Sequence, residues 1–466
     1  MAVTRIEREL NKNDKSLFLD ELSHVDTKCA QEIGEILKVN TTLQSIEIRF
    51  IHIGCVGTEY LVNGLKVNQH LQSLKLRGNH FGVEGAKYIS EMLKINKSLQ
   101  TLALNYNEFG SEGAEYIGRG LEENTSLHSI DLAHNKLGDE GTQYLAVGLK
   151  NNQGLQFIKL NYNKIGAQGA KCIGQVLKDN KTLQSVSLGW NSIGSEGAQY
   201  ISEALQDNMS LDSLILYGNN LGSEGAQTIS KGLEKNRSLR SINLGANKIG
   251  DEGAKYLAKT LEDNLTLKSI KLDYNRIGNE GAKCIAKGLK NNKSLEFIDL
   301  RGNNFNAEGE RALIEALATN TTLLKFAGIK GSTNKKQVRN YLNRNRILVG
   351  CEKPKEEIIQ EQLLGIINQL KTNITTQQNG RITDWYNHWK LGLLTAIEVN
   401  LNNKDPEEIN RVSCINEIRE ICAKKRNVLH FWANPHSVDE LEKLLEKIDW
   451  GIEQNVIEHD DNNPTI

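Results

Sequence analysis

Eleven leucines follow one another at a constant spacing of 28 residues, from Leu43 to Leu323. No insertion or deletion interrupts this spacing over 280 residues. A strict period of this length is typical of one supersecondary unit stacked many times, because each unit can bury its apolar face only against a neighbour. We therefore expect a solenoid, whose function depends on the side chains that its long surface exposes.

Each repeat begins with the pattern of a strand and continues with that of a helix. In the repeat of residues 71–98, Leu74 and its apolar neighbours alternate with polar residues, which predicts a short, half-buried strand. Ala86, Ile89 and Leu93 then recur at helical spacing, which predicts a helix with one buried face. When the first Leu is counted as position 1, position 13 is often Ser, Asp or Asn, and we expect these residues to cap their own helix.

Two columns of asparagine accompany the leucines. Position 9 is Asn in nine repeats, from Asn79 to Asn303, and a second column runs from Asn40 to Asn320 at the predicted helix-to-strand turn. An amide side chain can donate to and accept from loop backbone that has left the strand ladder, and losing such a partner costs about 1–3 kcal/mol. Nine members of the second column also form glycosylation sequons. Because the repeat explains these residues, we interpret them as structural.

The run LxxLxLxxN, followed by the run IGxEGA, resembles the ribonuclease-inhibitor-type class of leucine-rich repeats, over roughly residues 25–346. The resemblance implies an α/β solenoid, a horseshoe with parallel strands on the inner face and helices on the outer face. It does not define a function, since the class includes enzyme inhibitors, innate immune receptors, GTPase activators and secreted bacterial effectors.

The sequence predicts four parts. Residues 1–42 form an N-terminal cap and a degenerate repeat, 43–322 form ten repeats, 323–350 form a C-terminal cap with a basic helix, and 351–466 form an all-α bundle. The last boundary follows from composition, because residues 351–466 hold all four prolines and 13 Lys and Arg against 20 Asp and Glu. Apolar stripes at helical spacing, the first over 356–378, predict the bundle.

Composition and motifs argue against several classes of function. The formal net charge of −1 does not favour DNA binding, and no apolar segment reaches the length of a transmembrane span. Seven cysteines without CxxC spacing, and no signal peptide, predict a cytoplasmic protein (in the host cytoplasm if it is a secreted effector). Cys172 and Cys284 share a repeat position and are interpreted as core residues. No catalytic motif is present, so we expect no catalytic residue, cofactor or metal.

The stretch from Lys325 to Arg346 contains seven basic residues and no acidic one. Such a patch could bind an acidic partner, a phosphoinositide or RNA. The alternative is a solvated cap helix, which we favour because aromatic residues are nearly absent from it. The candidate basic patch consists of Lys335, Lys336, Arg339, Arg344 and Arg346.

Aromatic residues gather at position 8, at the rim of the predicted concave face. Gly and Ala also occur at this position, so the fold does not require a ring there. At about 4.8 Å per strand, Tyr106 and Tyr274 lie roughly 29 Å apart, comparable with the width of a protein interface. The alternative is that the rings only lean on one another and shield the loops. The candidate partner-binding residues are Tyr106, His134, Tyr162, Trp190, Tyr217 and Tyr274, flanked by Arg49, Arg77, Lys159 and Lys271.

The sequence therefore predicts a module that binds a protein partner on the concave face around Trp190, since Tyr, Trp and Arg dominate interface hot spots. Its architecture resembles that of leucine-rich-repeat effectors of intracellular bacteria, and a regulatory scaffold is the related possibility. A regulator of a small GTPase is an alternative. A ubiquitin-ligase-like enzyme in residues 351–466 is another, although Cys351, Cys414 and Cys422 do not match the Cys-x-Asp motif of such enzymes.

Overall fold

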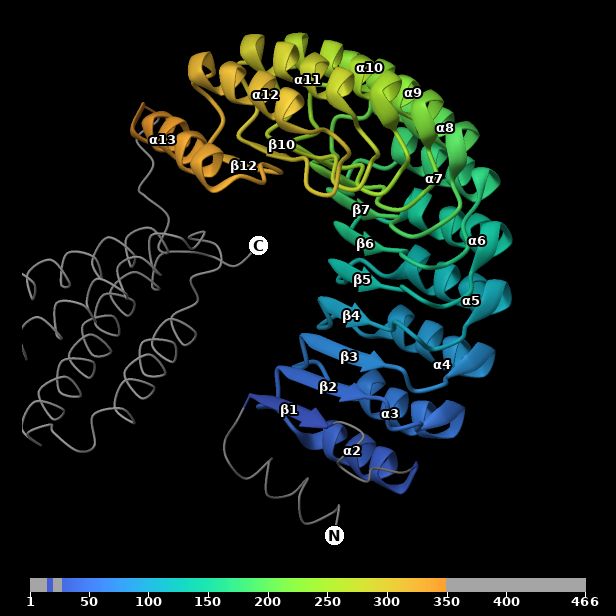
Figure 1. The fold of residues 1–466 in the computed structure, drawn as a ribbon. Coiled ribbons are helices and arrows are strands. Elements are labelled where there is room, and N and C mark those ends of the chain that lie inside the picture. Colours follow the sequence, from blue (N-terminus) through green and yellow to red (C-terminus); the bar gives the residue numbers. More distant parts are fainter. Residues whose placement is uncertain (1–14, 20–26, 349–466) are drawn as a thin grey trace, which may run out of the picture. The chain divides into compact units, whose positions relative to one another are not determined.

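A computed structural model describes residues 15–19 and 27–348 of the chain. The chain divides into two units, Met1–Val349 and Gly350–Ile466, and every described residue belongs to the first. The predicted helical bundle and the three candidate ligase cysteines lie outside the described residues. In the described part, twelve strands alternate with twelve helices, with the strands along the inner face of a curved solenoid and the helices along its outer face (Figure 1).

The strands are short and the helices have three to four turns. The strands are β1 (Ser16–Leu19), β2 (Ser45–Arg49), β3 (Ser73–Arg77), β4 (Thr101–Ala103), β5 (Ser129–Asp131), β6 (Phe157–Lys159), β7 (Ser185–Ser187), β8 (Ser213–Ile215), β9 (Ser241–Asn243), β10 (Ser269–Lys271), β11 (Phe297–Asp299) and β12 (Lys325–Ala327). The helices are α2 (Thr27–Val39), α3 (Gly54–Val67), α4 (Gly82–Ile95), α5 (Gly110–Glu123), α6 (Gly138–Asn151), α7 (Ala167–Asp179), α8 (Gly194–Asp207), α9 (Gly222–Lys235), α10 (Gly250–Asp263), α11 (Asn279–Asn291), α12 (Ala307–Thr319) and α13 (Ser332–Leu348).

The sheet is parallel and its strands follow chain order from β1 to β12. From β2 onward each residue pairs with the residue 28 positions later, for example Ile46 with Leu74. The first strand is offset by one residue, since Leu17 pairs with Ile46, as expected for a degenerate first repeat. The constant register places each repeat position in a straight column across the sheet. The predicted α/β solenoid with inner parallel strands and outer helices is therefore confirmed.

A continuous apolar core lies between the sheet and the helices. In α4 the buried residues include Ala86, Ile89 and Leu93, the three that define the helical spacing in the sequence. The leucines at repeat position 1 are all buried, from Leu43 to Leu323. The core is thus formed by the residues whose period first indicates the fold.

Both asparagine columns are hydrogen-bonded between repeats. At position 9, the Asn135 amide nitrogen donates to the carbonyl of Leu104 in the preceding repeat, and its Oδ1 accepts from the backbone N–H of Asn107. In the second column, Asn96 Nδ2 donates to the carbonyl of Leu65, while its Oδ1 accepts from the N–H of Leu99. From Asn68 to Asn320 the second column occupies the C-caps of the helices and is buried, which agrees with the structural interpretation.

The expected capping by position 13 is wrong in one respect, because Asp139 and Asp251 cap the helix of the next repeat and not their own. Position 13 lies inside the first turn of its own helix and makes no cap there. Asp139 Oδ1 instead accepts from the N–H groups of Gly166 and Gly169, at 2.6 and 2.8 Å, at the start of α7. Asp251 does the same for α11. Two orphan N–H groups of a helix are therefore satisfied from the neighbouring repeat.

The C-terminal end of the solenoid is closed by α13. Arg344 donates to the carbonyls of Leu317, Ala318 and Asn320, where α12 ends. A guanidinium at a helix C-terminus satisfies orphan carbonyls and interacts favourably with the helix dipole. Arg344, expected in a basic patch, thus has a structural role at the end of the last full repeat.

Candidate functional site

Five of the predicted partner-binding rings form one continuous stack, which we call the aromatic column: Tyr106, His134, Tyr162, Trp190 and Tyr217. The centroids of Tyr106 and His134 are 3.9 Å apart with an interplanar angle of 13°, and those of His134 and Tyr162 are 4.1 Å apart at 15°. The spacing increases to 5.5 Å between Tyr162 and Trp190. The rings do lean on one another, yet Tyr162 and Trp190 remain 42% and 48% exposed.

The backbone at position 8 is left-handed in nearly every repeat. Tyr106, His134, Tyr162 and Trp190 have φ values of 63°, 58°, 56° and 54°. This region is unfavourable for residues with a Cβ, and it explains why three other repeats carry Gly at the same position. Bulky rings therefore occupy backbone positions that glycine would fill without strain.

Glycine in the following repeat makes room for three of the position-8 rings, the first being Phe50 over Gly78. The Trp190 indole lies over Gly218, where an added Cβ would come within 2.9 Å of the ring. The Tyr274 ring lies over Gly302 in the same way. Tyr274 is 61% exposed and lies two repeats beyond Tyr217, outside the aromatic column.

His134 is a titratable residue of the aromatic column whose pKa depends on its neighbours. Its Nε2 lies 2.8 Å from the Tyr106 hydroxyl oxygen. Burial lowers the pKa of the His134 imidazole, and the positive charge of Arg77 lowers it further. The imidazole is therefore held in its neutral form, which stacks between two phenol rings without a charge to desolvate.

The two predicted arginines lie at the N-terminal end of the face and differ in their contacts. Arg49 forms an ion pair with Glu47 and lies over the Phe18 ring. Arg77 contacts two rings, with its guanidinium carbon 5.1 Å from the Phe50 centroid and 4.9 Å from that of Tyr106, and the two centroids are themselves 6.3 Å apart at an interplanar angle of 60°. Arg77 thus extends the stack by one cation and one more ring.

The predicted lysines lie farther along the concave face. Lys159 ends β6 and is exposed, and Lys271 ends β10 and is partly exposed. Asp273, two residues after Lys271, is only 8% exposed. Burial raises the pKa of the Asp273 carboxyl, and the negative charge of the nearby Asp299 raises it further. Sequence reasoning did not select Phe50 or Asp273, although both belong to the columns that contain the predicted residues.

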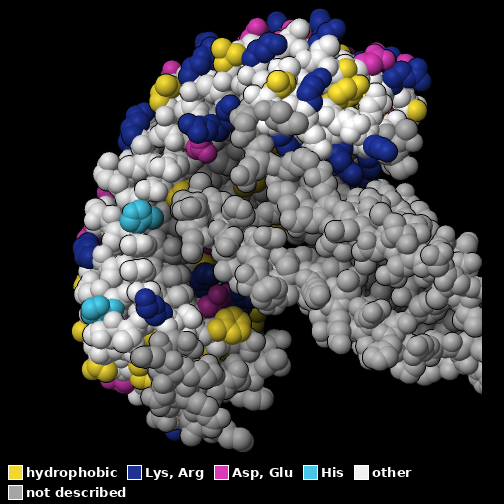
Figure 2. Space-filling view, turned by 90° about the vertical axis from the view of Figure 1, so that its left-hand side faces the viewer, with side chains coloured by type: hydrophobic (Ala, Val, Ile, Leu, Met, Phe, Trp, Pro, Cys, Tyr) yellow, Lys and Arg dark blue, Asp and Glu magenta, His cyan; other side chains and the backbone are white. Residues whose placement is uncertain are grey.

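The basic patch does not form one uniform surface. Arg344 is engaged at the end of α12, and Arg346 donates to Asn343. Lys336 is exposed, while Lys335 and Arg339 are partly exposed on α13. In the space-filling view, Lys and Arg side chains are spread over the upper part of the molecule with hydrophobic and acidic side chains between them (Figure 2).

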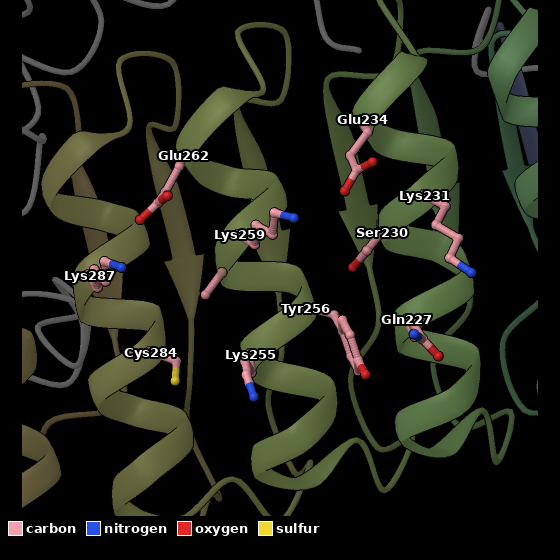
Figure 3. A pocket seen from close by; sticks show the side chains of 11 residues that line it. Gln227, Ser230, Lys231, Glu234, Lys255, Tyr256, Lys259, Glu262, Cys284 and Lys287 are labelled. Carbon is pink, nitrogen blue, oxygen red and sulfur yellow. The ribbon is translucent and has the colours of Figure 1, made fainter.

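A hollow lies on the outer face, between α9, α10 and α11, with a volume of about 640 Å³ (Figure 3). Ser230 on α9 and Tyr256 and Lys259 on α10 line it, together with Cys284 on α11. Cys172 and Cys284, expected as core residues, are both partly buried, and Cys284 packs against the apolar core. Burial still raises the pKa of each thiol, which disfavours the reactive thiolate.

Among residues 15–19 and 27–348, no group of three or more His, Cys, Asp or Glu side chains has the arrangement of a metal site. No helix among the described residues combines the length and apolarity that crossing a bilayer requires.

Comparison with known proteins identifies the repeat class. Residues 67–90, 96–118, 123–146, 151–174, 179–202 and 207–230 each match the family model described as leucine-rich repeat. Residues 224–348 match the model described as the TMOD/LMOD leucine-rich domain. No curated protein gives a significant match to the chain.

Several solved structures resemble the chain at low identity. Actin-binding site 2 of leiomodin-1 is 20% identical, covers 41% of this chain and 93% of its own, and has a TM-score of 0.28. The yeast Rad7–Elc1 complex is 18% identical, with coverages of 63% and 71% and a TM-score of 0.44. The leucine-rich repeat-containing protein LegL7 from Legionella pneumophila is 18% identical, with coverages of 70% and 95% and a TM-score of 0.41. Together, the repeat matches and the stacked strand–helix units show that the described residues form a leucine-rich-repeat domain.

Proposed function

We propose that the chain is a protein-binding module, without catalytic activity of its own, whose partner docks on the concave face at the aromatic column. Leucine-rich-repeat domains generally mediate protein–protein interaction through an extended concave surface. The observation that carries the proposal is the exposure of Tyr162 and Trp190 at left-handed backbone positions. Position 8 has this left-handed backbone in every repeat from Phe50 to Gly302, so the conformation belongs to the fold. What favours a functional site is the presence of large exposed rings where Gly would fit without strain.

The geometry of the column favours a protein partner over a nucleic acid. Single-stranded nucleic acids bind by stacking bases on free aromatic faces. Here the faces of His134 are covered by Tyr106 and Tyr162, so the column offers mainly ring edges and hydroxyl groups. Ring edges and hydroxyls pack well against mixed apolar and polar protein surface.

Affinity capture with the full chain tests the proposal. The Trp190→Ala and Tyr162→Ala double variant should lose the captured partner, because it removes two anchor residues of the kind that each contribute about 2 kcal/mol or more. Ala246 occupies the same repeat position with φ 53°, so alanine is compatible with this backbone. Tyr256→Ala on the outer helix α10 is the matched control and should retain the partner.

Mass spectrometry would compare partner recovery between wild type, the double variant and the control. Equal recovery by the double variant, with an unchanged circular dichroism spectrum, would rule out the concave face. The wider role as a bacterial effector or cytoplasmic scaffold is part of the same proposal, and the captured partner would identify it. The GTPase regulator and the ligase-like enzyme in residues 351–466 stay predictions, which GTP hydrolysis and ubiquitin transfer assays would test.

A further inference from the structure

Two charged side chains on the concave face share an unusual feature. Arg77 Nε and Asp273 Oδ1 are buried and have no hydrogen-bond partner among the described residues. Both residues occupy position 7 of their repeats, and they lie seven repeats apart in the same column. The aromatic column lies between them, since it runs from Tyr106 to Tyr217. A positive and a negative group therefore stand at opposite ends of the stack.

The positive group is held in place before any ligand arrives. The Arg77 guanidinium carbon lies 5.1 and 4.9 Å from the Phe50 and Tyr106 ring centroids, and the structure gives the side chain no ion pair with a described carboxylate. Glu47, on the neighbouring strand β2, is engaged by Arg49 and by Lys75, the latter at 3.5 Å. A planar guanidinium held against two rings keeps its edge donors aligned for a bidentate carboxylate.

The negative group, the Asp273 carboxylate, likewise has no ion-pair partner among the described residues. Asp299, the other carboxylate nearby, is engaged by Arg301, with a nitrogen–oxygen distance of 2.6 Å. No ion pair joins Lys271 to Asp273 within the described part of the chain. An added Cβ on Gly245 would lie 2.6 Å from both Asp273 Oδ1 and the Tyr217 ring, so the ring and the carboxylate adjoin over this glycine. A buried carboxylate with an unpaired oxygen is costly, and a cationic partner would remove that cost.

Building on the proposed function, we infer that the partner presents an extended peptide segment with a carboxylate on Arg77 and an ammonium or guanidinium group on Asp273. The two sites are about 34 Å apart along the sheet at 4.8 Å per strand, a span that roughly ten extended residues cover. Because the two charges differ in sign, they define the direction in which the segment lies on the aromatic column.

Access to Asp273 requires only a side-chain movement. The Tyr217 ring is partly exposed and adjoins the carboxylate over Gly245, so we expect rotation of this side chain to open the approach to Asp273. The displaced phenol can then cover the bound cation, where the ring face attracts positive charge. Tyr217 thus links the end of the aromatic column to the acidic site.

A displayed library of random 16-residue peptides, selected on the purified full chain, tests this inference. Wild type should enrich peptides in which an acidic and a basic residue lie about ten positions apart in one constant order. Arg77→Gln should remove the acidic preference and keep the basic one, and Asp273→Asn should do the reverse. Each change should weaken the best wild-type peptide by about tenfold, as expected for one charge-assisted contact.

Charge reversal separates a lost contact from a lost fold. Arg77→Glu should bind a peptide whose acidic residue is replaced by Lys better than it binds the original peptide, which a misfolded variant could not do. Arg240→Gln and Asp131→Asn are matched controls, since Arg240 forms an ion pair with Asp212 and Asp131 accepts from the N–H of Ala133. Both controls should keep the wild-type preference.

The outcomes distinguish this inference from the function on which it rests. If the Trp190→Ala and Tyr162→Ala variant selects the same peptides as wild type, the concave-face function itself is wrong. If that variant loses the peptides but Arg77→Gln and Asp273→Asn leave the charge preference of the selection unchanged, the function stands and the charge-directed orientation is overturned.

Discussion

The Trp190 indole lies directly over Gly218, and an added Cβ at Gly218 would come within 2.9 Å of its ring. Gly218 has φ 70°, so it is suited to the site both by its backbone conformation and by its lack of a side chain. This contact connects the sequence of one repeat to the position of a ring in the preceding one. The ring belongs to the proposed binding surface, so a glycine that contacts no partner can control that surface.

Gly218→Ala should therefore displace the Trp190 ring and destabilise the fold by about 1 kcal/mol or more. Gly222→Ala is the matched control, because Gly222 also has a positive φ of 66° but an added Cβ there meets no atom within 4 Å. Urea unfolding measures both costs, and only Gly218→Ala should also change the emission assigned to Trp190 by subtraction of a Trp190→Phe spectrum. Identical emission changes in the two alanine variants would contradict the ring contact.

Asp139→Ala should destabilise the start of α7 by about 1–2 kcal/mol, the usual cost of losing a helix N-cap. The substituted residue lies in α6, so its effect should appear in the neighbouring helix, where Gly166 and Gly169 lose their acceptor. Hydrogen exchange of the α7 amides provides the measurement. Ser195→Ala at the same position of another repeat is the control, since the Ser195 side chain forms no hydrogen bond with the described residues of the next helix, α9, whose N-cap is Leu221. Faster exchange confined to α6 would show that the cap is not between repeats.

These contacts show where sequence reasoning succeeds and where it stops. Leu74 and Ile89 reveal strand and helix because burial imposes a period on the chain, and a period can be read without a structure. Asp139 reveals a capping residue by its type but does not reveal which helix it caps, because that depends on how closely successive repeats approach. The column of rings follows from the constant register, so Tyr106 and Trp190 could be placed on one stripe in advance.

Other features of the candidate site depend on side-chain rotamers, which the repeat pattern does not determine. The contacts of Arg77 require the Phe50 and Tyr106 rings to approach edge to face across the intervening repeat, which carries Gly78 at position 8. Asp273 Oδ1 has no hydrogen-bond partner among the described residues, while the nearby Arg301 side chain forms its ion pair with Asp299. The sequence alone predicts the concave face and the rings on it. Which charged side chains of this face pair with one another can be seen only in the structure.

The stability of the aromatic column should depend on pH through His134. An imidazole in an unfolded chain titrates near pH 6.5. In the fold, burial and the charge of Arg77 lower the pKa of His134, so the unfolded chain binds more protons as the pH falls below that value. This contribution to stability is fully present above about pH 6.5 and is lost progressively as the pH falls toward the lowered folded pKa.

His134→Phe should reduce this pH dependence, because Phe keeps the stack and cannot titrate. Phe50 shows that this residue type is compatible with the left-handed backbone of position 8, at φ 54°. Unfolding free energies of wild type and variant, measured by urea at pH 7.5 and 5.5, provide the comparison. An equal loss in both proteins on acidification would assign the effect to other groups.

Asp273→Asn should stabilise the free protein at neutral pH by about 1 kcal/mol, because it removes a buried charge with an unpaired oxygen. Burial and Asp299 raise the pKa of Asp273 in the fold, so ionisation of this carboxyl opposes folding at pH 7. As the pH falls through the raised folded pKa and then the unfolded one, both states become protonated and the advantage of the variant should disappear. Urea unfolding at pH 7 and pH 3.5 measures this difference. A variant that is less stable than wild type at pH 7 would show that the Asp273 carboxylate already has a partner within the chain. It would then not be available to bind a cation of a partner.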